Sequence, residues 1–237
     1  MILLALDTCA LRGSVAVLRN ADPLQVANHE TSQDYSVWLL PAVEGVLQAS
    51  ALALPDVDVY AVAAGPGSFT GVRVGLTTVK AWAEVYGRPI ASVSRLEALA
   101  TQATSQSGYV AAFTDAQRGQ VFGALYRRTQ DKLQRIEDEM VIAPDRFLSW
   151  AAENAGADRI QWISTDPDCL TGTQAWEARQ AKNECIEAAD PSLAPAIGRL
   201  GYQVALEKRT ADALSLDANY VRRSDAEIFW KRGPKRT

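Results

Sequence analysis

The segment from Gly65 to Gly75 holds the residues with the clearest capacity for chemistry. Four glycines lie within these eleven residues. They follow a short apolar run and precede apolar residues at helical spacing, which predicts a strand-to-helix turn. Backbone N–H groups at the start of a helix bind anions, and glycines permit close approach of a phosphate or of another backbone. The segment is therefore either a phosphate-binding turn or part of a closely packed helix.

The phosphate-binding interpretation lacks its usual partners. A P-loop places a lysine and a serine or threonine directly after its last glycine, but here Val72 and Arg73 follow Gly71. The spacing of the first three glycines also differs from that of a dinucleotide-binding fingerprint. Gly71 and Gly75 are four residues apart, hence on one face of a helix, where they favour close packing against a second helix.

The remaining reactive side chains indicate little chemistry. His29 is the single histidine, which excludes a metal site built from several histidines of this chain. It lies in a polar stretch, so we expect a solvated surface residue. The cysteines Cys9, Cys169 and Cys185 have no CxxC spacing, so neither a disulfide framework nor a zinc site is indicated. We expect no catalytic residue, no metal and no cofactor.

Asp7 ends the first predicted strand and has two interpretations. One is a place near metal and phosphate, which only a resemblance to ATP-using proteins implies; the other, which we favour, is that Asp7 caps the turn that follows. The weak candidates for cofactor binding are Asp7, Gly65 and Gly67.

Composition sets broad limits on the class of protein. The chain has 237 residues, is 48% hydrophobic and carries a net charge of −4, so it can build one large domain or two modest ones. No apolar run approaches the length of a membrane span, and the N-terminus lacks the pattern of a signal peptide. We therefore expect a cytoplasmic protein with no membrane contact. Residues 222–237 hold six basic and two acidic residues, typical of either an RNA contact or a solvated terminus.

Hydrophobic periodicity predicts the elements that position these residues. The expected strands span 2–7, 14–19, 24–29, 57–64, 90–93, 109–115, 121–127 and 159–164. The expected helices span 34–49, 68–86, 94–106, 144–155 and 195–209, and 165–177 is expected to be a loop. Ser68 is the predicted N-cap of the second helix and Gly87 its predicted end.

The second half of the chain repeats the first. An apolar strand ends at Asp115 and is followed by Arg118-Gly119, just as the first strand ends at Asp7 and is followed by Arg12-Gly13. Either chance or an internal duplication explains this pattern. We expect an N-terminal lobe at 1–105 with the partner-binding helices, a C-terminal lobe at 106–194, a returning helix and a strand-like segment at 195–221, and a basic tail at 222–237.

Several motifs resemble one known family, in order along the chain. These are LALDTCALRGSVAVL, LLP at Leu39–Pro41, GPGSFTGVRVGLTTVKAWA, DAQRGQVFGALY and NYVRR. They resemble the TsaB (YeaZ) family of glycoprotease-like proteins over nearly the whole chain, and the glycine block is the most specific of them. The resemblance implies an α/β fold of two lobes, each of βββαβα type, as in the actin/Hsp70/sugar-kinase-like (ASKHA) superfamily.

The resemblance also implies a function. Members of the family are non-catalytic scaffold and dimerisation subunits that bind and activate TsaD, which transfers threonylcarbamoyl to an anticodon-loop adenosine of tRNA. The expected partners are a TsaD-like catalytic subunit, a TsaE-like ATPase, a second copy when the chain is alone, and tRNA through the complex. Two alternatives remain: a nucleotide-dependent enzyme of the sugar-kinase or peptidase-like type that uses Asp7 and the Gly65–Gly71 turn, and a homodimer with no obligatory partner.

The chain departs from the family pattern at two places. Tyr35 and Trp38 stand before LLP, where relatives often have a charged residue or histidine. Ser164-Thr165-Asp166 stands where the second lobe commonly has a glycine-rich turn, which weakens the nucleotide-binding alternative.

The helices expected at 34–49 and 68–86 are apolar over a wider arc than one buried face requires. This width predicts a second buried face, shared with a partner, and the resemblance places the partner on the same two helices. The predicted interface residues are Tyr35, Trp38, Leu39, Val43, Val46, Gly71, Val72, Gly75, Leu76 and Val79.

Overall fold

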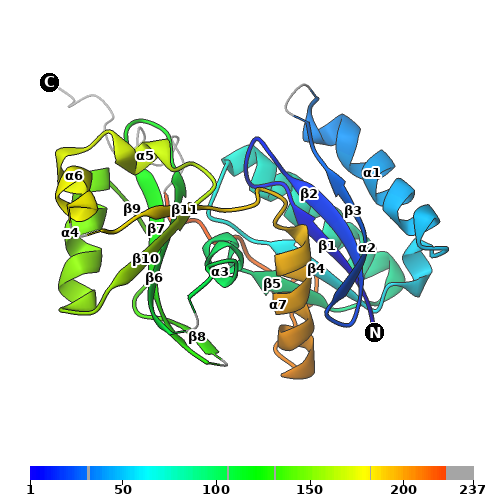
Figure 1. Ribbon diagram of the computed structural model, residues 1–237. Helices are drawn as coiled ribbons and strands as arrows, with labels where there is room; N and C mark the ends of the chain where they lie inside the picture. The colour runs from blue at the N-terminus through cyan, green and yellow to red at the C-terminus, as the bar shows by residue number, and fades with distance from the viewer. Residues whose placement is uncertain (31–32, 106, 131, 182, 223–237) are drawn as a thin grey trace, which may run out of the picture.

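The chain forms two β-sheets, one of five strands and one of six (Figure 1). The computed structural model describes residues 1–222 apart from 31–32, 106, 131 and 182. In the first sheet the strand order is β3-β2-β1-β4-β5. Its strands are β1 (Ile2–Asp7), β2 (Ser14–Arg19), β3 (Asp22–Asn28), β4 (Val59–Ala63) and β5 (Ile90–Val93). The first three strands pair antiparallel, and β1, β4 and β5 pair parallel.

The second sheet has the same topology as the first. Its order is β11-β10-β6-β7-β8, with β9 also paired to β7. The strands are β6 (Gly108–Asp115), β7 (Val121–Thr129), β8 (Lys132–Arg135), β9 (Met140–Ile142), β10 (Ile160–Ser164) and β11 (Ile186–Ala188). Again three strands form an antiparallel meander, and β6, β10 and β11 run parallel. Both the internal duplication and the two-lobed α/β fold class are confirmed.

Helices cover the sheets and separate them. On the first sheet α1 (Tyr35–Ala49) and α2 (Phe69–Tyr86) lie on one face and α7 (Ala194–Leu206) on the other; a 3₁₀ turn spans Leu54–Asp56. The short helix α3 (Arg95–Thr101) lies between the two sheets (Figure 1). On the second sheet α4 (Pro144–Ala155), α5 (Asp168–Thr171) and α6 (Gln174–Gln180) lie on the outer side.

The side chains that touch α2 and α7 show why these helices lie on opposite faces. Gly75 of α2 lies against Val62, and Gly201 of α7 lies against Ala61. Neighbouring residues of a strand point to opposite faces. The helix expected at 195–209 therefore returns to the first sheet and completes its cover.

Most predicted elements agree with the structure, and the differences have local causes. The strands at 2–7, 14–19 and 90–93 and the helix at 144–155 are confirmed to the residue. The helix expected to reach 106 ends at Thr101, and the loop expected at 165–177 contains α5 and the start of α6. The strands β8, β9 and β11 were not predicted because they are short and largely exposed or half-buried, so they carry no alternating apolar pattern.

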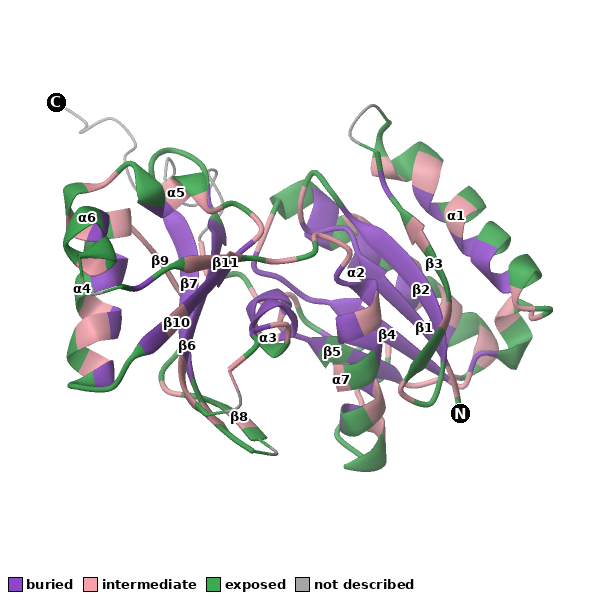
Figure 2. Ribbon diagram, in the orientation of Figure 1, coloured by how far each residue is buried: buried purple, intermediate pink, exposed green. Residues whose placement is uncertain are grey.

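The hydrophobic core forms two clusters of buried residues. Their strands are purple in Figure 2. The larger one lies on both faces of the first sheet and continues through α3. The smaller one lies between the second sheet and α4 and contains the ring systems of Phe147, Trp162 and Trp176. The division of the chain at residues 105 and 194 stays a prediction, and the basic tail lies outside the described residues except for Arg222.

Candidate functional site at the glycine turn

The glycine turn joins β4 to α2 in the predicted way. The Ser68 side chain caps the helix by accepting a hydrogen bond from the Gly71 N–H at 3.4 Å, and α2 ends at Gly87 with a left-handed φ of 62°. Gly65 has a φ of +116°, which disfavours any residue with a side chain.

The helical glycines of the turn pack against the β1–β2 loop of the same chain. A Cβ atom on Gly71 would lie 2.0 Å from the Thr8 carbonyl oxygen, and one on Gly75 would lie 2.6 Å from Thr8 Oγ1. Thr8 Oγ1 also donates to the Gly71 carbonyl oxygen at 2.7 Å. The close approach that these glycines permit is thus to Thr8 within the monomer, and not to a partner helix.

The space beside the first two glycines of the turn is also filled by the chain. Gly67 faces Cys9, whose carbonyl oxygen accepts from the Ser68 N–H at 2.7 Å. Gly65 faces Asn219, whose N–H donates to the Ala64 carbonyl oxygen at 2.8 Å. The candidate cofactor residues Gly65 and Gly67 therefore face protein backbone on the sides where a Cβ atom would project.

Asp7 is paired inside the protein. Its side chain is completely buried, and Arg95 Nε donates to its Oδ2 at 3.0 Å from the start of α3. Its Oδ1 accepts from the Cys9 N–H at 2.9 Å, as expected of a residue that caps the turn. The carboxylate thus already faces a cation of its own chain.

The buried pair changes the ionisation of its neighbours. Burial raises the pKa of the Cys9 thiol well above its ordinary value, and the Asp7 carboxylate raises it further. Burial alone would lower the pKa of Arg95, but the Asp7 charge outweighs this and leaves that pKa raised. Cys9 is therefore favoured as a buried thiol, which donates to the Ala63 carbonyl oxygen at 3.3 Å, rather than as the exposed thiolate typical of reactive cysteines.

The segment before the basic tail connects α2 to both sheets. The Tyr220 ring lies 5.2 Å from that of Phe69, and Arg73 Nε donates to the Tyr220 hydroxyl at 3.0 Å. The Arg73 guanidinium also lies 3.6 Å from the centre of the Phe69 ring, a cation–π contact. Arg222, the first residue of the basic tail, donates to the Ala116 carbonyl oxygen in the turn after β6 at 2.6 Å. The start of α2 is thereby fixed to the junction of the two lobes.

Eight of the ten predicted interface residues lie in the core of the monomer. On α1 these are Leu39, Val43 and Val46, and on α2 they are Gly71, Val72, Gly75, Leu76 and Val79. Tyr35 and Trp38 are half-buried. These residues pack on the first sheet within the monomer, because an amphipathic helix buries its apolar face on its own sheet. Any direct contact with a partner falls to the other sides of α1 and α2.

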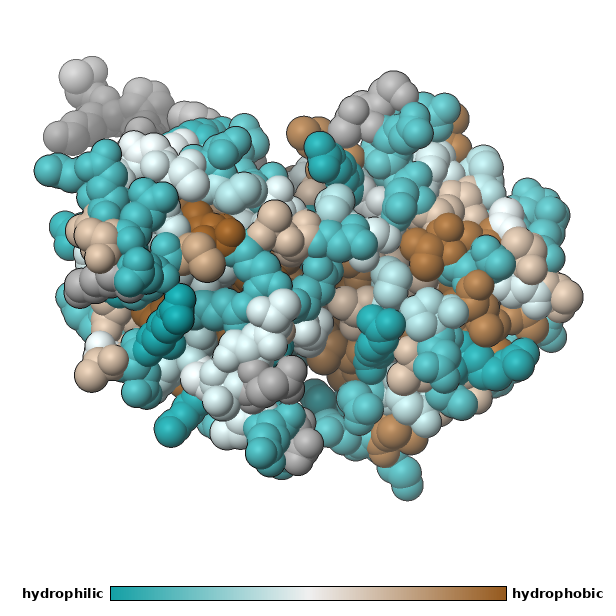
Figure 3. Space-filling view, in the orientation of Figure 1, coloured by the Kyte–Doolittle hydropathy of each residue, from teal (hydrophilic) through white to brown (hydrophobic). Residues whose placement is uncertain are grey.

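Those other sides carry apolar residues that are not among the ten predicted interface residues. Val37 is 65% exposed and Leu40 57% exposed on α1, while Val85 is 74% exposed on α2. Phe69, at the start of α2, is 38% exposed. We call Val37, Leu40, Phe69 and Val85 the outer apolar residues. Figure 3 shows hydrophobic side chains on the right of the molecule, in the region of β3 and α1.

His29 is buried, so the expectation of a solvated histidine is wrong. It is only 7% exposed. Its Nδ1 lies 2.9 Å from the Leu11 carbonyl oxygen and its Nε2 lies 2.7 Å from that of Gln33. Its ring stacks on Tyr35 at 4.2 Å. The polar residues next to His29 in the sequence suggested an exposed side chain. The ring can be buried because backbone carbonyl groups lie within hydrogen-bond distance of its nitrogen atoms.

We expect Trp38→Ala to destabilise the monomer as well as alter the surface of α1. The indole packs edge-on against both His29 and Tyr35, at 5.0 and 5.9 Å between ring centres. Loss of this half-buried ring should lower the free energy of unfolding by about 1–2 kcal/mol, less than for a core tryptophan. Urea unfolding measures this, with Val37→Ala on the exposed side of α1 as control. Equal stability of the two variants would contradict the packing role of Trp38.

Neither a metal centre nor a membrane span is found among the described residues. In that part of the chain, no three His, Cys, Asp or Glu side chains gather closely enough to hold a metal ion. None of the helices described there is both long and apolar enough to cross a bilayer.

Comparison with known proteins gives a consistent result. Residues 26–172, more than half of the chain, match the family model described as TsaD, tRNA N6-adenosine threonylcarbamoyltransferase. The tRNA threonylcarbamoyladenosine biosynthesis protein TsaB of Bacillus subtilis is 30% identical over 99% of this chain and 100% of its own length. The protein of the same name from Escherichia coli is 28% identical over 99% of each chain.

A solved structure agrees with this relationship. YeaZ from Pseudomonas aeruginosa superimposes with a TM-score of 0.73 at 27% sequence identity, over 92% of this chain and 99% of that one. Sequence identity over the full length, the match to the family model and the shared fold together show that the chain belongs to the TsaB/YeaZ family.

Proposed function

We propose that the chain is a non-catalytic subunit in the formation of threonylcarbamoyladenosine in tRNA. In this role it binds a TsaD-like transferase through the outer sides of α1 and α2 and activates it, a TsaE-like ATPase joins the complex, and a second copy occupies the same surface when the transferase is absent. The names of the full-length relatives support the pathway. The observation that carries the binding surface is the exposure of the outer apolar residues.

The geometry favours association over a structural explanation for Val37, Leu40 and Val85, whereas Phe69 also packs on Tyr220 and Arg73. Val37 and Leu40 are three positions apart, so they are neighbours on α1, and both are exposed beside the stripe that holds the buried Leu39 and Val43. The helices α1 and α2 contact each other on the same face of the first sheet. Exposed apolar side chains that lie together mark interaction sites, whereas single ones are common on any surface. Val37 and Leu40 lie together on α1, while Phe69 and Val85 lie at opposite ends of α2.

The same geometry argues against the alternative of a nucleotide-dependent enzyme. That reaction would need Asp7 and the glycine turn to reach a metal ion and a phosphate. Asp7 is instead buried against Arg95, and Gly65 and Gly67 face Asn219 and Cys9. These contacts support a role in which the turn fixes the position of α2 for a partner.

Charged substitutions in the outer apolar residues should weaken association and leave the fold intact. Leu40→Asp and Val85→Asp place a carboxylate where the proposed interface is apolar, and we expect affinity for a TsaD-like protein to fall about thirtyfold, or about 2 kcal/mol. Both positions are exposed, so the stability of the monomer should change by no more than about 0.5 kcal/mol. Light scattering of the mixed proteins and thermal melting give the two readouts.

A matched control lies on the opposite face of the first sheet. Leu206, at the end of α7, is 53% exposed, so Leu206→Asp makes the same chemical change away from α1 and α2. It should leave association and threonylcarbamoyladenosine formation by the reconstituted components unchanged. Loss of binding in Leu206→Asp with retention in the other two variants would place the partner on α7. If the unaltered chain binds neither a TsaD-like protein nor itself, the proposed function fails.

A further inference from the structure

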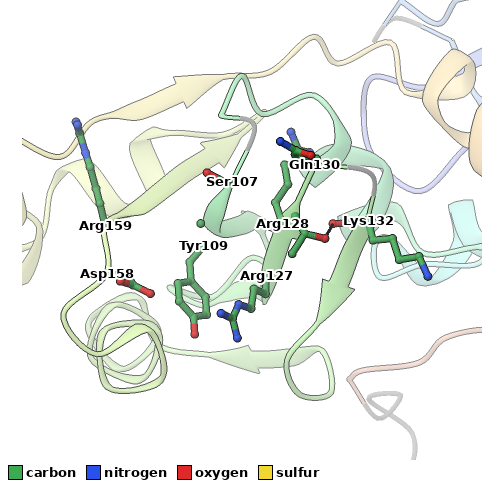
Figure 4. A pocket seen from close by; sticks show the side chains of 10 residues that line it. Ser107, Tyr109, Arg127, Arg128, Gln130, Lys132, Asp158 and Arg159 are labelled. Atoms are coloured by element: carbon green, nitrogen blue, oxygen red, sulfur yellow. Dashed lines mark hydrogen bonds between the residues drawn. The ribbon is translucent and has the colours of Figure 1, made fainter.

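A cavity of about 750 Å³ lies on the second sheet, apart from α1 and α2 (Figure 4). Its walls come from the start of β6, the end of β7, the turn into β8 and the segment before β10. Four cationic side chains and one carboxylate are among the residues that line it: Arg127, Arg128, Lys132, Arg159 and Asp158. This excess of positive charge stands out because the whole chain has a net charge of −4.

One of the four cations already serves the fold. The Arg128 guanidinium donates to the carbonyl oxygens of Ala100 and Ala103 at 2.6 Å and of Ser105 at 3.0 Å. It thereby ties the end of β7 to the end of α3, and burial lowers its pKa. The cations left to act on a ligand are Arg127, Lys132 and Arg159.

These three side chains are exposed, and within the described residues none of them lies within ion-pair distance of a carboxylate. Each comes from a different segment around the cavity, and in Figure 4 the Lys132 and Arg159 side chains extend away from Arg127. Arg159 does donate one hydrogen bond, to the Asn183 carbonyl oxygen at 2.8 Å, which fixes its position. Cations without a carboxylate partner at a surface cavity are suited to a polyanion.

An aromatic ring lies beside the cations. Tyr109 of β6 is the direct cross-strand partner of Arg127 on β7, so the two side chains share one face of the sheet. Further along this face Phe113 and Leu125 are covered by α4 as part of the second core cluster. Tyr109 packs at the margin of that cluster and is only half-buried. Its ring is therefore both supported by the core and open to the cavity (Figure 4).

We propose that this cavity binds RNA, with Arg127, Lys132 and Arg159 on backbone phosphates and the Tyr109 ring stacked on a base. The proposal rests on the proposed function in taking tRNA as the source of that RNA. A pocket for a small molecule is mostly apolar and enclosed, whereas this one is lined by exposed polar and charged side chains. Cations combined with an aromatic platform are typical of single-stranded nucleic acid sites.

The test measures binding of a tRNA transcript to the full-length chain alone by fluorescence anisotropy at several salt concentrations. Each phosphate contact removed should lower the slope of log affinity against log salt by about 0.7–0.9. The double variant Arg127→Ala/Lys132→Ala should therefore lose about 1.4–1.8 units of slope. Arg127→Lys should retain the slope, and Tyr109→Leu should weaken binding about fivefold or more without changing it.

The control variant is Arg19→Ala, which removes an exposed arginine at the end of β2 in the first sheet and should leave the slope unchanged. The proposal is overturned if the unaltered chain does not bind tRNA at low salt, if the double variant keeps the full slope, or if Arg19→Ala loses as much. Competition by millimolar inorganic phosphate as strong as that by tRNA would instead assign the cavity to a small anion. Because the pocket residues lie off α1 and α2, failure here leaves association with a TsaD-like protein unaffected, and the two proposals can fail separately.

Discussion

Gly71→Ala should be among the most damaging single substitutions in this chain. The added Cβ atom would lie 2.0 Å from the Thr8 carbonyl oxygen, a backbone atom held between β1 and the glycine turn. Either α2 or the β1–β2 loop must move, and overpacking of this kind costs about 3 kcal/mol or more. The free energy of unfolding from urea denaturation of the monomer should fall by that amount.

Gly45→Ala provides the matched control, since it is the same substitution in a neighbouring helix. A Cβ atom on Gly45 meets nothing within 4 Å, so alanine should stabilise α1 by about 0.5–1 kcal/mol. The contrast separates packing within the monomer from packing between proteins. If Gly71→Ala leaves the monomer as stable as Gly45→Ala and only impairs association, then the close contact of Gly71 is with a partner after all.

Arg95→Met should have an effect of similar size for an electrostatic reason. It leaves the buried Asp7 carboxylate without its cation, and removal of one partner from a buried ion pair costs about 3–5 kcal/mol. The double variant Asp7→Asn/Arg95→Met removes both charges while keeping an acceptor for the Cys9 N–H. It should therefore be more stable than the sum of the two single variants indicates, which a double-mutant cycle measures.

An exposed ion pair gives the comparison for this experiment. Arg209 Nε lies 2.6 Å from the Glu207 carboxylate, with both side chains more than half exposed. Arg209→Met should change stability by no more than about 0.5 kcal/mol because water screens such pairs. Equal losses in Arg95→Met and Arg209→Met would show that burial does not make the Asp7–Arg95 pair special.

Local patterns in the sequence were sufficient for the main elements and for the family. The apolar alternation of β1 and β2, the helical spacing of α2 and the caps at Ser68 and Gly87 depend on near neighbours, so they could be predicted without the fold. The repeat of a strand, an aspartate and an Arg-Gly turn also indicated the duplication, because both copies use the same local chemistry. Short edge strands such as β8 were not predicted because few of their residues are buried.

The tertiary structure decided what each side chain touches. Asp7 and Arg95 are 88 residues apart in sequence, and Thr8 and Gly71 are 63 apart, so no spacing rule joins them. Periodicity predicted how wide the apolar arcs of α1 and α2 are. It did not predict which residues of each arc pack on the first sheet. That choice buried Leu39 and Val72 and left Leu40 and Val85 outside, because the orientation of a helix is set by the surface it packs on.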